Sequence, residues 1–328
     1  MNVLTPQTPE AWNAYVRSFA GWDIYYLCEY AVSLKLHGDG DPLLLCFEHG
    51  AERMCYVVMR KDIADDPRFH GLLPAGRLFD LETPYGYGGP LTDAPLSPEA
   101  QQIFMEELRA YCLEQRIVTQ FLRYHPLLDN HGAVSPMTDT RYLRDTIYMD
   151  TASPELILAN MDSKNRNMVR KAQRSGVTVR KAPMSEYAPF LELYRQTMDK
   201  HSAGDYYTFG TSYFDYLSVH LSDHAFLLYA ELEETPISGD IFFHTNGSMH
   251  YHLAGSDAAY RNLAAGNLLL YEAALWGAAH GVSKLHLGGG MAPEDARLIS
   301  QGEISFRFRC LELLEDLLGY FRASGEGI

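Results

Sequence analysis

The sequence predicts an α+β protein of two domains, and three observations support this class. The chain has 328 residues, of which 47% are hydrophobic and 12% aromatic, so two packed cores of ordinary size can form. Helix-start signals alternate with strand-like runs. Both halves also follow one order, with helices, an antiparallel hairpin, a loop, a helix and a strand. We expect the domains to be 1–150 and 151–328, with the last 15 to 20 residues packing back on the first domain.

In the first half, helix starts are marked by a hydroxyl residue followed by proline and glutamate, as at Thr8 and Ser97. The hydroxyl can cap free amides, and proline suits the first helical position. The second helix should run from Ser97 to about Gln115. The runs PLLLCFEHG and ERMCYVVMRKDI predict a hairpin, and IVTQFLRYHP predicts a strand after the second helix.

In the second half, the same signal at Ser153 predicts a helix that continues to Arg174, followed by the strand VTVRKA and a helix over 185–201. The strand AFLLYAEL then precedes the hairpin ISGDIFFH-TNGS-MHYHLAG, in which Asn246-Gly247 is a strong turn signal. A helix over 267–280 and the strand VSKLHLG follow.

The hairpin turn also predicts a strand register. A two-residue turn pairs Phe243 with His250 and Ile241 with His252, so both histidines share one sheet face. Asp240 and His244 then point to the opposite face.

Composition excludes several classes of protein. The net charge of −15 disfavours binding of nucleic acid over a broad surface. No apolar stretch is long enough for a membrane helix, and the N-terminus lacks signal-peptide features, so we expect a cytoplasmic protein. The five cysteines are odd in number and contain no C-x-x-C pair, which predicts core residues and neither a disulfide framework nor a zinc site. The oligomeric state is left open.

The segment YRNLAAGN lies between a strand-like run and a helix-like run. A helix begins with unpaired amides and a partial positive charge, small residues allow a ligand to approach them, and arginine adds a charged contact. We therefore interpret the segment as a candidate pyrophosphate site. The alternative is that small residues permit tight strand–helix packing and that the asparagine is an N-cap. The candidate cofactor-binding residues are Arg261, Asn262, Ala264, Ala265, Gly266 and Asn267.

A second candidate for anion binding is the segment 163–181, which has seven basic residues and no acidic one. Arginines at spacings of four lie along one helical stripe, opposite an apolar side. Like charges on one helix repel each other, so either a bound anion or acids of the other domain should neutralise them. The candidate residues are Lys164, Arg166, Arg170 and Arg174.

The order of strand, Arg-x-x-Ala-x-Gly, helix and strand resembles the cofactor-binding core of the GNAT acyltransferase superfamily. Its usual pattern is Gln/Arg-x-x-Gly-x-Gly/Ala, so Arg261 and Gly266 match while Ala264 replaces the first glycine. The segments NMDSKNRNMVRKAQRSGVTVR, KLHLGGG, FDLETPYGYGGPL and RDTIYMD extend the resemblance to the FemABX-like transferases over most of the chain. This resemblance implies two tandem GNAT-like domains, each with a mixed, mainly antiparallel sheet flanked by helices, and a cleft between them.

The resemblance also implies where the acceptor binds. FemABX-like enzymes hold it in the cleft, and the glycine- and tyrosine-rich loop Tyr85–Pro90 is our candidate for lining it from the first domain, unless the loop is only a structural turn. Phe308-Arg309 can correspond to the Phe-Lys element that ends the family core. The further candidate substrate-binding residues are Tyr85, Tyr87, Gly88, Arg123 and Arg309.

The candidate catalytic residues are His250, Asp240 and His244, because imidazole titrates near neutral pH and can accept a proton from an incoming amine. The register offers two histidines on one face, whereas a metal site needs three or four ligands, so no metal is expected. No nucleophile motif is present, which favours direct acyl transfer.

We therefore expect an N-acyltransferase that acts on an amine of a small molecule or of a cell-envelope precursor, such as a peptidoglycan precursor. Acyl-CoA is slightly preferred as donor over aminoacyl-tRNA, because only one helix is strongly basic. The alternative is a non-catalytic protein that kept the fold to bind a phosphate-containing envelope precursor.

Overall fold

The computed structural model describes residues 1–69, 71–134, 139–201, 205–289 and 300–309, which fall into two compact units. Unit 1 comprises Met1–Arg144 and the described residues from Gly302 onward, and unit 2 comprises Asp145–Gln301. The expected packing of the last 15 to 20 residues lies outside the described residues. Across the described part of the chain, no helix combines the length and apolar character that crossing a bilayer requires.

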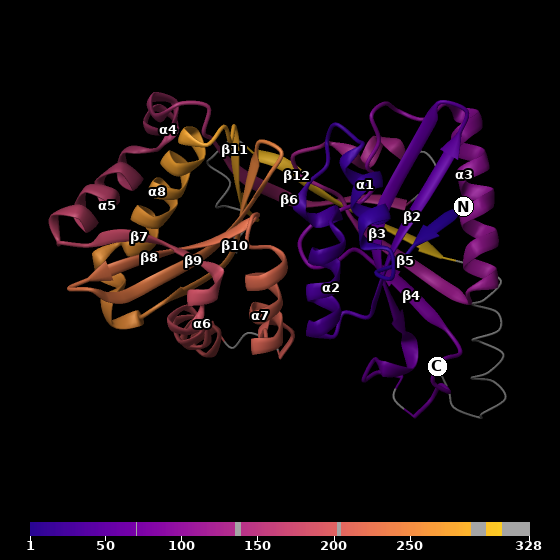
Figure 1. Cartoon of the computed structure of the whole chain (residues 1–328), viewed down its shortest axis with the longest axis horizontal. Helices are drawn as coiled ribbons and strands as arrows, with labels where there is room; N and C mark the ends of the chain where they lie inside the picture. Colours follow the sequence, from indigo (N-terminus) through magenta and orange to yellow (C-terminus); the bar gives the residue numbers. More distant parts are fainter. Residues whose placement is uncertain (70, 135–138, 202–204, 290–299, 310–328) are drawn as a thin grey trace. The chain divides into compact units, whose positions relative to one another are not determined.

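Unit 1 contains a mixed sheet with the strand order β1-β2-β3-β4-β5-β12. All neighbours are antiparallel except β4 and β5, which are parallel. Helix α3 packs on one face through Phe104, whose ring lies 5.5 Å from that of Phe47. Helices α1 and α2 lie on the other side of the sheet (Figure 1). The strands are β1 (Asn2–Leu4), β2 (Asp41–His49), β3 (Glu52–Asp62), β4 (Phe79–Glu82), β5 (Ile117–Arg123) and β12 (Ser300–Arg309), and the helices are α1 (Pro9–Arg17), α2 (Cys28–His37) and α3 (Pro98–Glu114).

Unit 2 contains a mixed sheet with the order β6-β11-β10-β9-β8-β7, of which β6 begins in the last residues of the first segment of unit 1. Only β10 and β11 are parallel. Helices α4, α5 and α8 cover one face, and α6 and α7 cover the other (Figure 1). The strands are β6 (Asp139–Asp150), β7 (Thr178–Pro183), β8 (Ala225–Leu232), β9 (Thr235–Thr245), β10 (Ser248–Ser256) and β11 (Lys284–Gly288), and the helices are α4 (Pro154–Asn160), α5 (Ser163–Arg174), α6 (Ala188–His201), α7 (Thr211–His220) and α8 (Ala265–Ala279).

The core of unit 2 forms between the sheet and α8. Phe242 of β9 and Met249 of β10 are fully buried against Leu269 and Ala273 of α8. Each large apolar side chain buried in this way contributes about 1.5 to 3 kcal/mol relative to an exposed one. This packing fixes the position of the first turn of α8 relative to the ends of β9 and β10.

The single helix predicted from Ser153 to Arg174 is wrong, because the structure has two helices with a break at Met161 and Asp162. The Asp162 side chain accepts a hydrogen bond of 2.6 Å from the amide of Asn165 and so caps a new helix start. Similarly, Asn267 is not an N-cap, since α8 starts at Ala265 and the cap residue is Ala264.

The hairpin register is confirmed at one position and wrong at the other. Phe243 pairs with His250 as predicted, but Ile241 pairs with Leu253. A β-bulge between Tyr251 and Leu253 inserts His252 as an extra residue, which the pattern of alternation does not reveal.

Candidate active site

The first turn of α8 presents free backbone amides. Its cap residue, Ala264, has left-handed backbone angles (φ 59°, ψ 35°) and no side chain caps the helix. The amides of Asn267 and Leu268 reach the carbonyl of Ala264 at 3.2 and 3.4 Å, whereas those of Ala265 and Gly266 have no acceptor among the described residues. Two donors at the positive end of the helix dipole are therefore available to an anion.

A cavity of about 360 Å³ lies at this helix start, between the ends of β9 and β10 and the 3₁₀ helix η7 (Ala258–Leu263). We call it the α8 cavity. It is lined by five of the six residues predicted to bind the cofactor, and the sixth, Asn262, is an exposed residue of η7 outside the lining. The five are Arg261, Ala264, Ala265, Gly266 and Asn267.

Gly266 leaves open space in this cavity. A Cβ atom at Gly266 would meet nothing within 4 Å, and the backbone φ is not positive. Neither close packing nor backbone conformation therefore requires glycine at this position. A ligand that approaches the helix amides would explain why position 266 has no side chain, because glycine leaves room for it.

Asp240 borders the same cavity from β9 and is only 1% exposed. Its Oδ2 atom has no hydrogen-bond partner among the described residues. Burial raises the pKa of this carboxyl well above its usual range, so the neutral form is favoured. A buried neutral carboxyl at the edge of a cavity can donate a hydrogen bond to a ligand.

The structure does not bring the other two predicted catalytic residues to this place. His250 is fully buried on the sheet face opposite Asp240, and its ring lies 5.6 Å from that of His286 on β11. The His244 ring lies 4.9 Å from the Trp276 ring. Burial, followed by the nearby charges of His224, Lys181 and His280, lowers the pKa of His244 to about 4, so it is a weak base at neutral pH.

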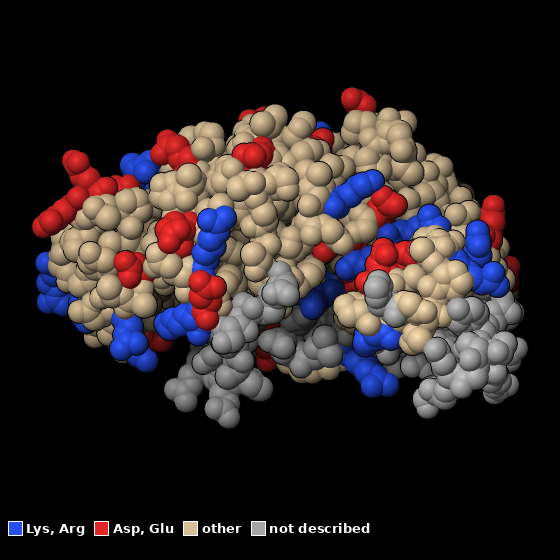
Figure 2. All heavy atoms as spheres, turned by 90° about the horizontal axis from the view of Figure 1, so that it is seen from below, with Lys and Arg blue, Asp and Glu red and all other residues tan. Residues whose placement is uncertain are grey.

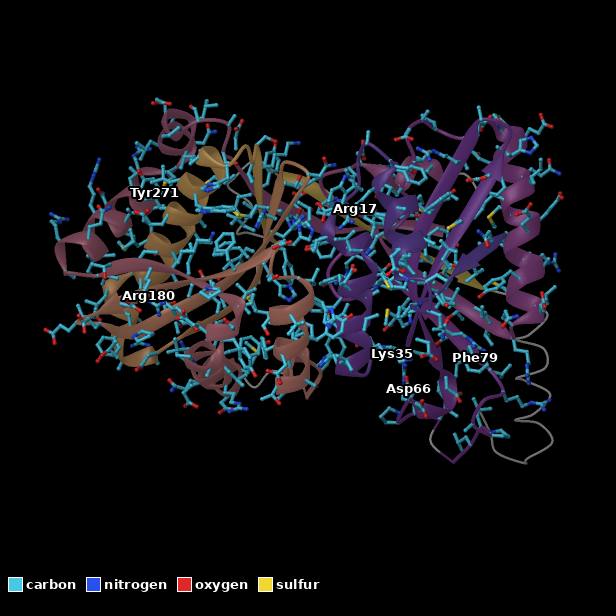
Figure 3. The ribbon with its side chains drawn as sticks, in the orientation of Figure 1. Arg17, Lys35, Asp66, Phe79, Arg180 and Tyr271 are labelled. Carbon is cyan, nitrogen blue, oxygen red and sulfur yellow. The ribbon has the colours of Figure 1, made fainter. Side chains whose placement is uncertain are left out.

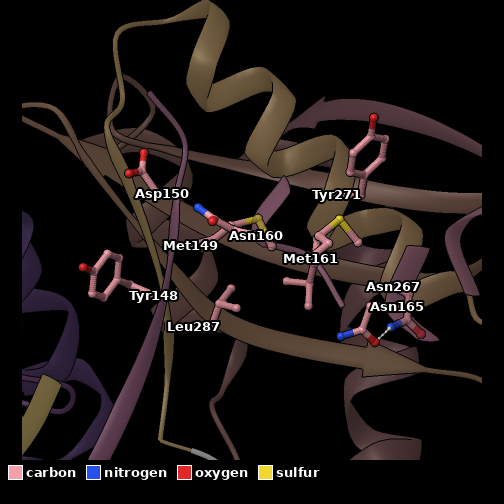
Figure 4. A pocket seen from close by; sticks show the side chains of 10 residues that line it. Tyr148, Met149, Asp150, Asn160, Met161, Asn165, Asn267, Tyr271 and Leu287 are labelled. Carbon is pink, nitrogen blue, oxygen red and sulfur yellow. Dashed lines mark hydrogen bonds between the residues drawn. The ribbon is translucent and has the colours of Figure 1, made fainter. Parts of the chain in front are cut away.

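Helix α5 adds positive charge beside α8. Asn267 donates a hydrogen bond of 3.2 Å to Asn165 and so joins the first turns of the two helices (Figure 4). None of Lys164, Arg166, Arg170 and Arg174 forms an ion pair with a described carboxylate of unit 2. Instead, Arg166 donates to the carbonyls of Leu158, at 3.1 Å, and Met161. The positive face of α5 is therefore available to an anion.

The candidate substrate-binding loop Tyr85–Pro90 packs against other residues of unit 1. A Cβ atom at Gly86 would lie 2.5 Å from the Tyr25 side chain, and Gly88 accepts hydrogen bonds from Tyr26 (3.1 Å) and Asn130 (2.8 Å). The contact with Tyr25 gives Gly86 a packing role, and the two hydrogen bonds hold the backbone at Gly88.

The other candidates of unit 1 lie as follows. The Tyr85 carbonyl accepts from Tyr30 at 2.5 Å, Tyr87 is 9% exposed, and Arg123 reaches the Gly86 carbonyl at 3.5 Å. Arg309 ends β12 and pairs with Thr119 of β5.

Sequence reasoning missed a second cavity of unit 2, with a volume of about 180 Å³, which we call the amide cavity (Figure 4). It lies between the turn that joins α4 to α5, the first turns of α8, and strands β6 and β11. It shares Asn267 with the α8 cavity. The spacing of four between Asn267 and Tyr271 puts both on one helix face and was the available signal. The lining residues are Tyr148, Met149, Asp150, Asn160, Met161, Asn165, Asn267, Leu270, Tyr271 and Leu287.

Comparison with known proteins gives one matching family model and several similar solved structures. Residues 160–295 match the family model of the acetyltransferase (GNAT) domain. The crystal structure of FemX is 13% identical and superposes with a TM-score of 0.68, covering 97% of this chain and 99% of that one. The C-terminal domain of a putative lysylphosphatidylglycerol synthetase from Agrobacterium fabrum is 11% identical, with a TM-score of 0.58 and coverage of 95% and 94%. L-PGS from Bacillus licheniformis is 13% identical, with a TM-score of 0.54 and 95% of each chain covered. Among curated protein sequences, none matches significantly.

The fold and the matched domain define an acyltransferase. Residues 160–295 match the acetyltransferase (GNAT) domain, and the α+β fold with tandem GNAT-like units is confirmed by the match to FemX over 97% of this chain.

Proposed function

We propose that this acyltransferase uses acyl-CoA as donor and transfers its acyl group to the amine of a small molecule or a cell-envelope precursor. The observation that carries this proposal is the α8 cavity, in which the free amides of Ala265 and Gly266 face open space beside Arg261. Two backbone donors, a helix dipole and a guanidinium group together suit a pyrophosphate.

In the proposed reaction, the amine nitrogen attacks the thioester carbonyl carbon, the carbon–sulfur bond breaks, and the amine proton passes to the departing thiolate. The α8 amides and Arg261 hold the donor phosphates. The neutral carboxyl of Asp240 donates a hydrogen bond to the carbonyl oxygen as negative charge develops on it. Holding both reactants in one orientation supplies much of the rate, about 7 to 11 kcal/mol for well-aligned pairs.

Charge distribution favours acyl-CoA over aminoacyl-tRNA. The chain has a net charge of −15, and acidic and basic side chains are interspersed on the face seen in Figure 2. Binding of a tRNA acceptor stem needs a continuous basic surface, whereas CoA needs only a local phosphate site. Because CoA thioesters are made in the cytoplasm, we place the reaction there. A structural relative named as a putative lysylphosphatidylglycerol synthetase supports an envelope component as acceptor.

The variant Gly266→Val tests the proposal, because Gly266 lines the α8 cavity and a Cβ atom at this position would meet no other protein atom within 4 Å. We expect calorimetry to show CoA binding to the wild-type protein and at least a tenfold loss in the variant, equivalent to about 1.4 kcal/mol. Gly132→Val is the matched control, since Gly132 also has open space and no positive φ but lies in unit 1.

Thermal unfolding should show that both valine variants remain folded. If the wild-type protein binds a tRNA acceptor-stem minihelix and not CoA, the proposed donor is wrong. Equal CoA affinity in wild type and Gly266→Val would remove the α8 cavity from the reaction.

A further inference from the structure

The amide cavity adjoins the α8 cavity, in which the donor phosphates are proposed to bind. Asn267 lines both cavities, so a ligand that lies along the first turn of α8 can extend from one to the other. Sites for drug-sized ligands usually have about 300 to 1,000 Å³, so a cavity of about 180 Å³ suits one ring system and not a whole cofactor.

Its walls suit a flat aromatic ring with a polar edge. Met149, Met161 and Leu287 offer apolar surface, and Tyr271 offers an aromatic ring (Figures 3 and 4). Apolar and aromatic side chains can cover the faces of a ring system, as they do for bases in nucleic-acid complexes.

Three asparagines line the same cavity, namely Asn160, Asn165 and Asn267. Asn165 and Asn267 are joined by their hydrogen bond, while the Asn160 side chain has no partner among the described residues. An asparagine amide can donate to N7 and accept from the N6 amino group of adenine, which is a specific way to read this base. The carboxylate of Asp150, at the other end of the cavity, is a second acceptor for an amino group.

The charges around the cavity suit the phosphates of an adenine nucleotide. Arg166 donates to the carbonyl of Met161, a lining residue, so a guanidinium group lies at the turn that closes the cavity. Lys164 precedes Asn165 on the exposed side of the first turn of α5. A phosphate on the ribose would therefore meet positive charge near the base.

We propose that the amide cavity binds the adenine base of the acyl donor, with Asn160 reading its polar edge. The inference rests on the proposed function, because it assumes that the α8 cavity holds the donor phosphates. Adenosine is common to CoA and to the 3′ end of tRNA, so the shared chemistry is an adenine nucleotide.

The test measures binding of two halves of CoA to the full-length protein by calorimetry, using adenosine 3′,5′-bisphosphate and 4′-phosphopantetheine. We expect Asn160→Ala to weaken adenosine 3′,5′-bisphosphate about tenfold, which is the typical effect of losing a specific base contact. The affinity of Asn160→Ala for 4′-phosphopantetheine should stay within about twofold of the wild-type affinity. Leu287→Trp, which fills the cavity, should abolish binding of the nucleotide, and Asn167→Ala is the matched control because Asn167 lies on α5 outside the cavity.

The outcomes separate the inference from the proposed function. If 4′-phosphopantetheine and CoA bind while Asn160→Ala leaves the nucleotide affinity unchanged, the adenine site is wrong and the donor proposal stands. If the wild-type protein binds neither half of CoA nor CoA itself, both are wrong. Two further ligands distinguish the source: loss of affinity for AMP relative to the 3′,5′-bisphosphate indicates CoA, while tight binding of a CCA-ended minihelix that Asn160→Ala weakens indicates tRNA.

Discussion

At the residue scale, Ala264 has a backbone conformation that is unfavourable for a residue with a Cβ atom. Its φ of 59° lies in the left-handed region, which costs a residue with a Cβ atom about 1 to 2 kcal/mol and glycine almost nothing. The usual GNAT pattern has glycine here, and the conformation explains why. Ala264→Gly should therefore stabilise the protein by about 0.5 to 1 kcal/mol after the entropy cost of glycine is subtracted, as measured by urea unfolding.

Ala265→Gly is the control for this substitution, because Ala265 is helical and 7% exposed. Glycine in a helix costs up to about 1 kcal/mol relative to alanine, so the control should lower stability. A loss of stability in both variants would contradict the strain assigned to Ala264.

Asp240 makes stability depend on pH. Its pKa is raised by burial, so between the unfolded value of about 3.9 and the higher folded value the native state holds more protons than the unfolded state. The contribution of Asp240 to the free energy of unfolding is fully present below about pH 3.9. It is lost as the pH rises from there through the higher pKa of the folded state. Asp240→Asn removes the ionisation, so its stability relative to wild type should increase from pH 4 towards pH 9 in urea unfolding. A difference that does not change with pH would show that the carboxyl is not buried as described.

At the scale of the element, α5 should act through its charge. The double variant Lys164→Gln, Arg170→Gln removes two exposed positive charges of α5, whose first turn is joined to that of α8 by Asn165. CoA affinity should therefore fall about threefold to tenfold at low salt, and the difference should shrink at 1 M salt. Arg180→Gln is the matched control, because Arg180, which Figure 3 labels, is also in unit 2. It is paired with Glu186 at 2.8 Å and with Glu231 at 2.9 Å. An equal loss in the control would mean that only the net charge matters.

Elements with a local signal could be predicted, and elements without one could not. Ser97 and Ser153 accept hydrogen bonds from amides of the helices that they precede, as the capping pattern predicts. Helix α2 has Leu27 before its first residue and no side-chain cap, so nothing in its sequence marks its start. The break before α5 is hard to predict because the helix start at Ser153-Pro154 and the later arginines are typical of one amphipathic helix, although Asp162 is itself a capping residue.

For the whole molecule, the candidate site also combines residues that a local sequence signal predicts with residues that no local signal predicts. Arg261 and Ala264–Asn267 are contiguous, so the chemistry of a helix start was visible in the sequence and their common cavity could be expected. Asp240 and the contact between Asn165 and Asn267 join residues far apart in the chain, and this depends on strand order and helix packing. The bulge at His252 likewise changes which side chains meet across the hairpin.

Ligand binding should stabilise the whole molecule through the site in unit 2. A ligand that binds only the native state adds about 2.7 kcal/mol at 100 times its dissociation constant. For a folding unit of this size, that corresponds to a rise in Tm of about 5 to 10 °C in scanning calorimetry. We expect CoA to produce this shift in wild type and in Gly132→Val, and a shift of about half this size or less in Gly266→Val, because a tenfold weaker affinity lowers the stabilisation at the same CoA concentration to about 1.4 kcal/mol. An equal shift in Gly266→Val would show that CoA binds elsewhere, because the valine would occupy the space that the phosphates need.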